Sequence, residues 1–309
     1  MGAQRDVNRT PTVAVIGMAT VDYLYVLEHH PQADSVTPAL EYHTVLGGSA
    51  GRGAIAAQRI GGAARLLATC GDDVHAEFLK AQLDAEGVKC TWVTYDQPSQ
   101  HSAVIVARQE ATRTIVWLPQ PMADARALAR LPEFLEGADV ALLDSTDEAL
   151  ATTALDECER RGIVTVLDTG SGRPWTRSLV DRAHHVIAPE KYVVKETGHQ
   201  AEQAIAELWS SSCRVFGVTR GRGGGVFTTG DDRGRLQRWE AAPVAAVDSN
   251  GAGDTFHGAY AWAVAMGRPT AECFELASWA AGLKLTRPGN AGIPTLDELE
   301  RARGSRGSS

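Results

Sequence analysis

Alternation of short apolar strands with amphipathic helices is the feature that most limits the folds open to this chain. From residue 139 onward, strand segments alternate with helical segments: strands at DVALLD, IVTVLD, HHVIA and RVFGVT, and helices at 147–161, 175–183 and 190–210. Strands joined through helices pair in parallel by right-handed crossovers, and the helices cover both faces of the sheet. The sequence therefore predicts an α/β fold with a mostly parallel central sheet.

The N-terminal part predicts the same sheet and a second, smaller one. A strand at 12–17 and a strand at ARLLATCG alternate with helices at 47–62 and 72–87. Other β-rich pieces have no helix between them, and they lie near 20–28, 38–45, 91–95, 102–108 and 113–118. We interpret them as a small β lid, formed by about 18–46 and 90–120, that covers the ligand-binding edge of the main sheet. Residues 1–309 are predicted to form one domain.

Composition excludes several classes of partner. The chain has 30 Lys and Arg against 38 Asp and Glu, a net charge of −8, whereas nucleic-acid binding depends on clustered cations. Its five cysteines are scattered without a CxxC pair, which is typical of reduced thiols. No apolar run reaches the roughly 18 residues of a membrane span, and the N-terminus has no signal-peptide pattern. We expect a cytoplasmic protein that binds neither nucleic acid nor membrane.

The stretch VDSNGAGDTFHGAYAWAVAMG at 247–267 places a glycine turn directly before an apolar helix. The free backbone N–H groups of Gly251, Ala252 and Gly253, together with the helix dipole, favour an anion at this point. Asp254 is either that anion, as a helix cap, or works beside a second anion such as a phosphate. No GxxxxGK[ST] loop is present, and GRGGGV at 221–226 does not complete GxGxxG, which disfavours P-loop NTPases and plain Rossmann dehydrogenases.

The motif DSNGAGDTFHGA, an early Gly-Gly helix and a T-x-G-x-x-G run together resemble the PfkB or ribokinase-like family of sugar and nucleoside kinases. The resemblance extends from Gly17 to about Pro294, and its most specific part is close to the C-terminal signature D-T-x-G-A-G-D-x-F, with Ser249 in place of the Thr. It implies that Asp254 takes the proton from the attacking sugar hydroxyl. The N–H groups of the turn would then stabilise charge on the transferred phosphoryl group. ATP and Mg²⁺ are the implied cofactors.

The resemblance also places the nucleotide. Thr219, Gly221 and Gly224 would allow the backbone to approach it, and the base would lie between 219–230 and the 277–292 region, which contains Asn290. The alternative for the three residues of the T-x-G-x-x-G run is ordinary hairpin chemistry.

Two short sequence segments are candidate metal-ion sites. Asp248 and Ser249 match a pair that helps form a monovalent-cation site, for K⁺, in related kinases, and a simple Asx or Ser turn is the alternative. The N-x-x-E element of the family, which organises Mg²⁺ through water, should fall at PEKY (189–192), but its Asn and its second acid are absent. Glu190 remains as a candidate outer-shell ligand.

On the substrate side, Asp22 follows the first strand where family members place an aspartate that binds sugar hydroxyls, with a solvated turn acid as the alternative. Gly47 and Gly48 match the Gly-Gly pair whose backbone contacts the sugar. Arg52 stands where ribokinases carry a sugar-binding Asn. An arginine within a run of small residues needs an anionic partner. It either binds an acidic group of the substrate, or it turns outward or pairs with a local acid such as Asp72.

The function predicted from the resemblance is transfer of the γ-phosphoryl group of ATP to a primary hydroxyl of a small sugar. The C-terminal part is most similar to sulfofructose-kinase-like and ketohexokinase-like members, and Arg52 would suit a ketose or an acidic or sulfonated sugar such as 6-deoxy-6-sulfofructose. A nucleoside kinase and a catalytically silent sugar-binding regulator are the alternatives. Exposed strand edges in the lid predict a homodimer formed through it.

Overall fold

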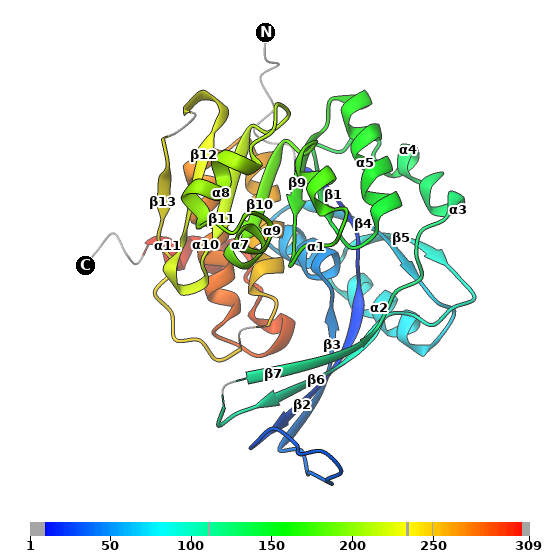
Figure 1. The fold of residues 1–309 in the computed structure, drawn as a ribbon. Coiled ribbons are helices and arrows are strands. Elements are labelled where there is room, and N and C mark those ends of the chain that lie inside the picture. Colours follow the sequence, from blue (N-terminus) through cyan, green and yellow to red (C-terminus); the bar gives the residue numbers. More distant parts are fainter. Residues whose placement is uncertain (1–9, 111, 233–234, 249, 305–309) are drawn as a thin grey trace.

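The protein is represented by a computed structural model that describes residues 10–110, 112–232, 235–248 and 250–304, and its strands form two sheets (Figure 1). The larger sheet has the order β13-β12-β11-β10-β9-β8-β1-β4-β5. Its strands are β1 (Thr12–Ile16), β4 (Ala63–Cys70), β5 (Lys89–Thr94), β8 (Val140–Asp144), β9 (Val164–Asp168), β10 (His185–Pro189), β11 (Val215–Thr219), β12 (Gly225–Thr229) and β13 (Gln237–Trp239). Pairing is parallel from β11 to β5, and β12 and β13 add antiparallel. The predicted, mostly parallel α/β sheet is confirmed.

Helices cover both faces of this sheet because successive strand residues point to opposite sides. Val13 and Val15 pack in one core cluster, and Ala14 and Ile16 pack in the other. The first cluster includes residues of α1 (Ser49–Arg59), α2 (Val74–Ala85), α9 (Ala252–Ala265), α10 (Thr270–Lys284) and α11 (Leu296–Gly304). The second includes residues of α4 (Leu131–Phe134), α5 (Glu148–Arg161), α6 (Thr176–Val180), α7 (Glu190–Thr197) and α8 (Ala201–Leu208), and α3 (Ala125–Leu128) packs against α5.

Local sequence signals set the ends of helix α5. The Asp147 carboxylate accepts a hydrogen bond from the backbone N–H of Leu150, which caps the first turn. The helix stops at Gly162, whose φ of 68° is left-handed. Another glycine corrects a prediction: the segment 190–210 is not one helix but α7 and α8, because Gly198, with a φ of 74°, ends α7.

The lid is a separate four-stranded sheet of order β3-β2-β6-β7, which projects from the C-terminal edge of the main sheet (Figure 1). Its strands are β2 (Thr20–Leu27), β3 (Glu41–Gly47), β6 (His101–Ala107) and β7 (Thr112–Leu118). One prediction was wrong here: residues 91–95 do not join the lid, because β5 pairs in parallel with β4 at the edge of the main sheet. Helix α2 is the crossover that returns the chain to that sheet.

Three short 3₁₀ turns complete the described chain: η1 (Gly221–Gly223), η2 (Gly230–Asp232) and η3 (Gly289–Gly292). None of the helices in the described residues is long and apolar enough to cross a membrane. All five cysteines are free thiols.

Candidate active site

The turn before helix α9 forms the centre of the site. Gly251 is the N-cap of α9 with a φ of 79°, a left-handed value that favours glycine. A Cβ atom added at Gly253 would meet no atom within 4 Å, so the space beside the first helical turn is open. Asp254 lies in this turn with 23% of its side chain exposed. The start of the helix, with its free N–H groups, and a partly exposed carboxylate therefore lie in the same turn.

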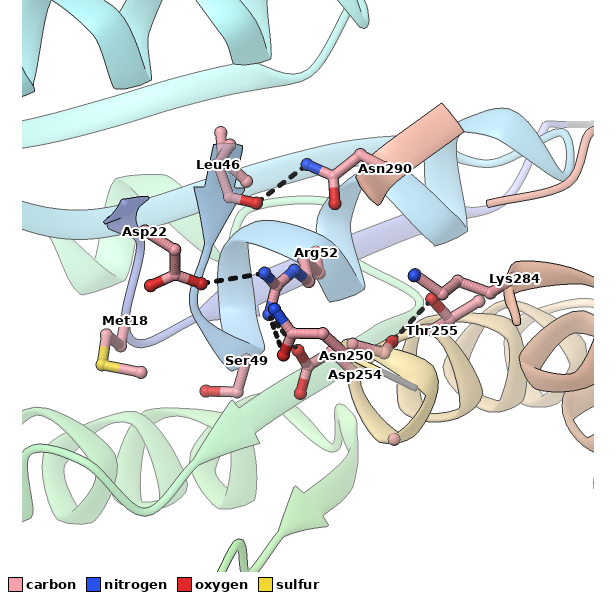
Figure 2. A network of polar contacts seen from close by, with 12 residues as sticks. Met18, Asp22, Leu46, Ser49, Arg52, Asn250, Asp254, Thr255, Lys284 and Asn290 are labelled. Atoms are coloured by element: carbon pink, nitrogen blue, oxygen red, sulfur yellow. Dashed lines mark hydrogen bonds and ion pairs between the residues drawn. The ribbon is translucent and has the colours of Figure 1, made fainter. Parts of the chain in front are cut away.

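A guanidinium group connects this turn to the lid. Arg52, near the start of α1, donates from Nη2 to Oδ2 of Asp22 at 2.9 Å and from Nη1 to Oδ2 of Asp254 at 3.3 Å. Nη1 also lies 3.5 Å from Oδ1 of Asn250. Figure 2 shows the arginine between the two carboxylates. The structure thus joins residues from the lid, α1 and α9 that the sequence assigned separately to substrate binding and catalysis.

Arg52 is buried, with 7% of its side chain exposed, so it does not turn outward, and its carboxylate partners are Asp22 and Asp254 and not Asp72. Its stem also packs on the α9 turn: a Cβ atom at Gly251 would lie 2.7 Å from Cδ of Arg52. Two carboxylates share one guanidinium, so the group as a whole is negative.

The Gly-Gly pair lets the backbone at the start of α1 pack closely against Asp22 and Met18. A Cβ atom at Gly47 would lie 2.2 Å from Oδ2 of Asp22, and one at Gly48, whose φ is 89°, would lie 2.4 Å from the carbonyl oxygen of Met18. Oδ1 of Asp22 accepts a hydrogen bond from Oγ of Ser102 on β6, at 2.7 Å. Asp22 is therefore a buried, fully oriented carboxylate and not a solvated turn acid.

Asp248 has three donors around its carboxylate. Oδ2 accepts from Nζ of Lys284 at 2.8 Å and from the backbone N–H of Gly289 at 2.9 Å, and Oδ1 accepts from the N–H of Asn250 at 2.9 Å. Burial opposes ionisation of Asp248, but these hydrogen bonds and the Lys284 charge hold its pKa below the usual value. Burial lowers the pKa of Lys284, and Asp248 counteracts that effect. Ser249, the other predicted cation ligand, lies outside the described residues.

The predicted nucleotide residues fall in two places. Thr219 ends β11, and Gly221 and Gly224 form the turn into β12 with φ values of 55° and 69°. Asn290 lies elsewhere in η3, where its Nδ2 donates to the carbonyl oxygen of Leu46 at 2.9 Å (Figure 2). Its amide nitrogen therefore holds the end of lid strand β3.

Glu190, the candidate Mg²⁺ residue, begins α7 at the same edge of the sheet. Its Oε1 accepts a hydrogen bond from Nε of Arg220 at 2.9 Å, and Nη2 of Arg220 donates to Glu202 at 2.7 Å. A carboxylate that is paired with an arginine in this way fits contact with a metal through water better than direct ligation.

Sequence reasoning missed three residues near the turn before α9: Asp144, Asp168 and His257. Asp144 ends β8, and its Oδ2 accepts from the N–H of Met18 at 2.8 Å. Asp168 ends β9, and its Oδ2 lies 3.3 Å from Nδ1 of His257 on α9. Burial raises the pKa of Asp168 against the opposing effect of His257, and the Asp254 charge adds to the rise. The sequence contained a signal for the two aspartates, because the predicted strands DVALLD and IVTVLD both end in aspartate at the edge of the sheet where ligands bind.

Comparisons with known proteins show what the whole chain is similar to. The pattern of the pfkB family of carbohydrate kinases matches residues 10–296. The ribokinase of Bacillus subtilis (strain 168) is 26% identical over 302 residues, which cover 93% of this chain and 98% of that protein. A fructokinase of Klebsiella pneumoniae is 26% identical over 282 residues, which cover 83% of this chain and 91% of that protein.

The solved structure of Arabidopsis thaliana ribokinase complexed with ribose and ATP shares the fold. Its TM-score is 0.81 at 21% identity, and the match covers 95% of this chain and 99% of that one. The fold is therefore ribokinase-like. Because the family pattern spans nearly the whole chain, the protein belongs to the pfkB family of carbohydrate kinases, which are phosphotransferases with an alcohol group as acceptor.

Proposed function

We propose that this kinase transfers the γ-phosphoryl group of ATP to a primary hydroxyl of a small sugar, with Asp254 as the base. The observation that carries the proposal is the position of Asp254 in the open first turn of α9, joined through Arg52 to Asp22 of the lid. An acceptor held by Asp22 would lie beside Asp254, and phosphoryl transfer depends mainly on such positioning and on electrostatic stabilisation.

The chain's own groups supply the steps. Asp254 accepts the proton of the acceptor hydroxyl as the oxygen attacks phosphorus, and the bond from phosphorus to the leaving oxygen of ADP breaks. The backbone N–H groups of Gly251, Ala252 and Gly253 belong to the start of α9, where the first N–H groups of a helix have no partner within it. There they donate to the phosphoryl oxygens without reorganising, which lowers the barrier.

The two carboxylates paired with Arg52 favour a substrate that presents a neutral hydroxyl group, and not an anion, to this guanidinium. A substrate anion at this guanidinium would meet two carboxylates that already share it, and would have to displace Asp22 or Asp254. A sugar hydroxyl can instead donate to Asp22 and accept from Arg52, so both groups stay satisfied. We therefore propose a neutral ketose or pentose as the acceptor. An acidic or sulfonated sugar such as 6-deoxy-6-sulfofructose remains the competing acceptor, and a riboside is a third.

The nucleotide is proposed to lie against the β11–β12 turn. Thr219, Gly221 and Gly224 form this turn at the C-terminal edge of the sheet, where ligands of open α/β sheets bind. A Cβ atom at Gly221 would meet nothing within 4 Å, so the turn can accept a close ligand. Asn290 contacts the lid strand, so we propose that it couples the lid to the nucleotide-side loop.

We propose that Mg²⁺ is held mainly by the ATP phosphates and water. The described residues contain no group of three His, Cys, Asp or Glu side chains that could hold a metal ion. Glu190 would orient a metal-bound water while paired with Arg220. When bound, the ion neutralises charge on the phosphates.

A homodimer through the lid is also proposed. Strand β7 is an edge of the lid sheet, and all of its residues are exposed. Its apolar members Ile115, Val116, Trp117 and Leu118 are between 40% and 64% exposed. An exposed apolar edge strand is a template for pairing, and a second copy of the lid would cover it. We also propose a cytoplasmic location, where cysteines remain free thiols as they are here.

The test is an acceptor screen that measures ADP release from ATP with ketoses, aldoses, sugar acids, sulfonated sugars and nucleosides. We expect the highest kcat/KM for a neutral sugar with a free primary hydroxyl. A preference for a sulfonated or carboxylated sugar would overturn the neutral acceptor. A preference for nucleosides would replace the sugar with a riboside.

A further inference from the structure

Lys284 is a cation buried beside the catalytic turn. It ends helix α10, none of its surface is exposed, and its Nζ lies 2.8 Å from Oδ2 of Asp248. A lysine is almost never fully buried unless it is paired. Its partner Asp248 lies just before the α9 turn in sequence, and Oδ1 of Asp248 accepts the N–H of Asn250, which precedes Gly251.

Asp248 is the carboxylate that the family resemblance assigns to a monovalent cation, and the groups around it do not fit such an ion. A metal cation needs oxygen atoms with free lone pairs. Oδ2 of Asp248 instead accepts from both Lys284 and Gly289, which uses its two lone pairs, and Oδ1 accepts from Asn250. A K⁺ ion next to this carboxylate would also lie beside a fixed positive charge.

We propose that the Lys284 ammonium takes the place of the monovalent cation, so that this kinase works without K⁺. An ammonium group and a K⁺ ion carry the same charge and are similar in size. The lysine is covalently tethered, so no binding equilibrium limits its occupancy. The proposal deepens the proposed kinase function, on which it rests.

The Lys284 ammonium would have two effects: it balances negative charge in the site, and it helps to fix the conformation of the turn before α9. The site holds the carboxylates of Asp22, Asp248 and Asp254 against the cations of Arg52 and Lys284. Without Lys284 a buried carboxylate would lose its counter-charge, and added negative charge near the α9 turn would repel the phosphoryl group. Asp248 would also lose one of the three donors that fix it, and with it the orientation of Asn250. Lys284 is thus a positioning residue.

The first experiment uses the wild-type protein in KCl and in choline chloride at equal ionic strength. We expect acceptor-dependent ADP release to agree within about twofold and the midpoint of thermal unfolding to be unchanged, because a ligand that does not bind adds no stability. A clear rise of either quantity with KCl would overturn the proposal. The unfolding measurement decides this even if no acceptor is phosphorylated, a result that would count against the proposed function alone.

The second experiment compares two substitutions. Lys284→Ala leaves room for a cation, whereas Lys284→Met fills the space with an apolar chain of similar length. In choline chloride both should lose about a hundredfold in kcat, the scale seen when one preorganised electrostatic group is removed. KCl or NH₄Cl should raise the kcat of Lys284→Ala at least tenfold and should also raise its unfolding midpoint. Neither salt should change the kcat or the midpoint of Lys284→Met. Equal responses of the two variants would contradict the proposal, and if neither folds, the wild-type comparison decides.

Discussion

Nη1 of Arg52 lies 3.3 Å from Oδ2 of Asp254, so the residue that stands in the place of the family's sugar-binding Asn directly contacts the proposed base. The same guanidinium contacts Asp22 of the lid at 2.9 Å. In the proposed mechanism, one buried side chain therefore links acceptor recognition to proton transfer. Removing that side chain should disturb both.

Arg52→Ala should lower kcat/KM for the best neutral sugar by about ten- to a hundredfold, because a charge-assisted contact contributes roughly 1.5–3 kcal/mol and two carboxylates would lose their partner. Arg52→Lys should recover only part of this, since an ammonium cannot bridge both carboxylates as the planar fork does. The measurement is the ratio of kcat/KM for an acidic sugar to that for a neutral sugar. If only the acidic substrate suffers in Arg52→Ala, then Arg52 binds a substrate anion.

Gly251→Ala should destabilise the protein. Its φ of 79° is unfavourable for alanine, and the new Cβ would lie 2.7 Å from Cδ of Arg52, so we expect a loss of about 1–3 kcal/mol in the free energy of unfolding. Gly253→Ala is the matched control, because that position is helical and a Cβ there meets no atom within 4 Å. Urea unfolding of both variants checks this, and equal stability of the two would show that the turn is not constrained by Arg52.

Val116→Glu should convert a dimer into a monomer. Val116 is 64% exposed in edge strand β7, and buried negative charges from two copies would oppose lid-to-lid pairing. Val74→Glu is the control, since Val74 is 70% exposed but lies at the start of α2. Sedimentation equilibrium gives the mass of each variant. A wild-type monomer, or a dimer that survives Val116→Glu, would exclude this interface.

Asp73 should make stability depend on acid pH. Burial opposes its ionisation, but hydrogen bonds from Ser99 and from the backbone N–H of Ala76 lower its pKa from 3.8 to about 2. Because the folded-state pKa is depressed, the stabilisation is present above pH 4 and is lost as pH falls toward 2. The difference in free energy of unfolding between wild type and Asp73→Asn should therefore shrink over this range. A constant difference between pH 5 and pH 2.5 would contradict the depressed pKa.

The sequence predicted those parts of the site that depend on neighbouring residues. The Gly251–Asp254 turn, the Gly47–Gly48 pair and the position of Asp22 after the first strand follow from local motifs, and the structure places them together. The partners of Arg52 could not be predicted from local motifs. Asp22 and Asp254 lie 30 and 202 residues away in sequence, and only the folded chain brings them into contact with Arg52.

Lys284 shows the same limit. In the sequence it is the one basic residue of the α10 segment, at the end of the helix, and only the packing of α10 reveals that it is buried against Asp248. The two wrong predictions about the fold concerned segments whose structure depends on tertiary contacts or on a single glycine. Strand β5 was assigned to the lid although helix α2 returns it to the main sheet, and Gly198 divides a helix that apolar periodicity made continuous.

The most direct test of the account is acceptor-dependent ADP release by wild type and by Asp254→Asn. The substitution keeps the size of the side chain but removes the base, so kcat should fall by about 10²–10⁴, the usual scale for general-base catalysis. Binding of the acceptor, measured by calorimetry, should persist, because Asp22 and the Gly47–Gly48 backbone remain. An Asp254→Asn variant that turns over at the wild-type rate would contradict the central claim that Asp254 is the base.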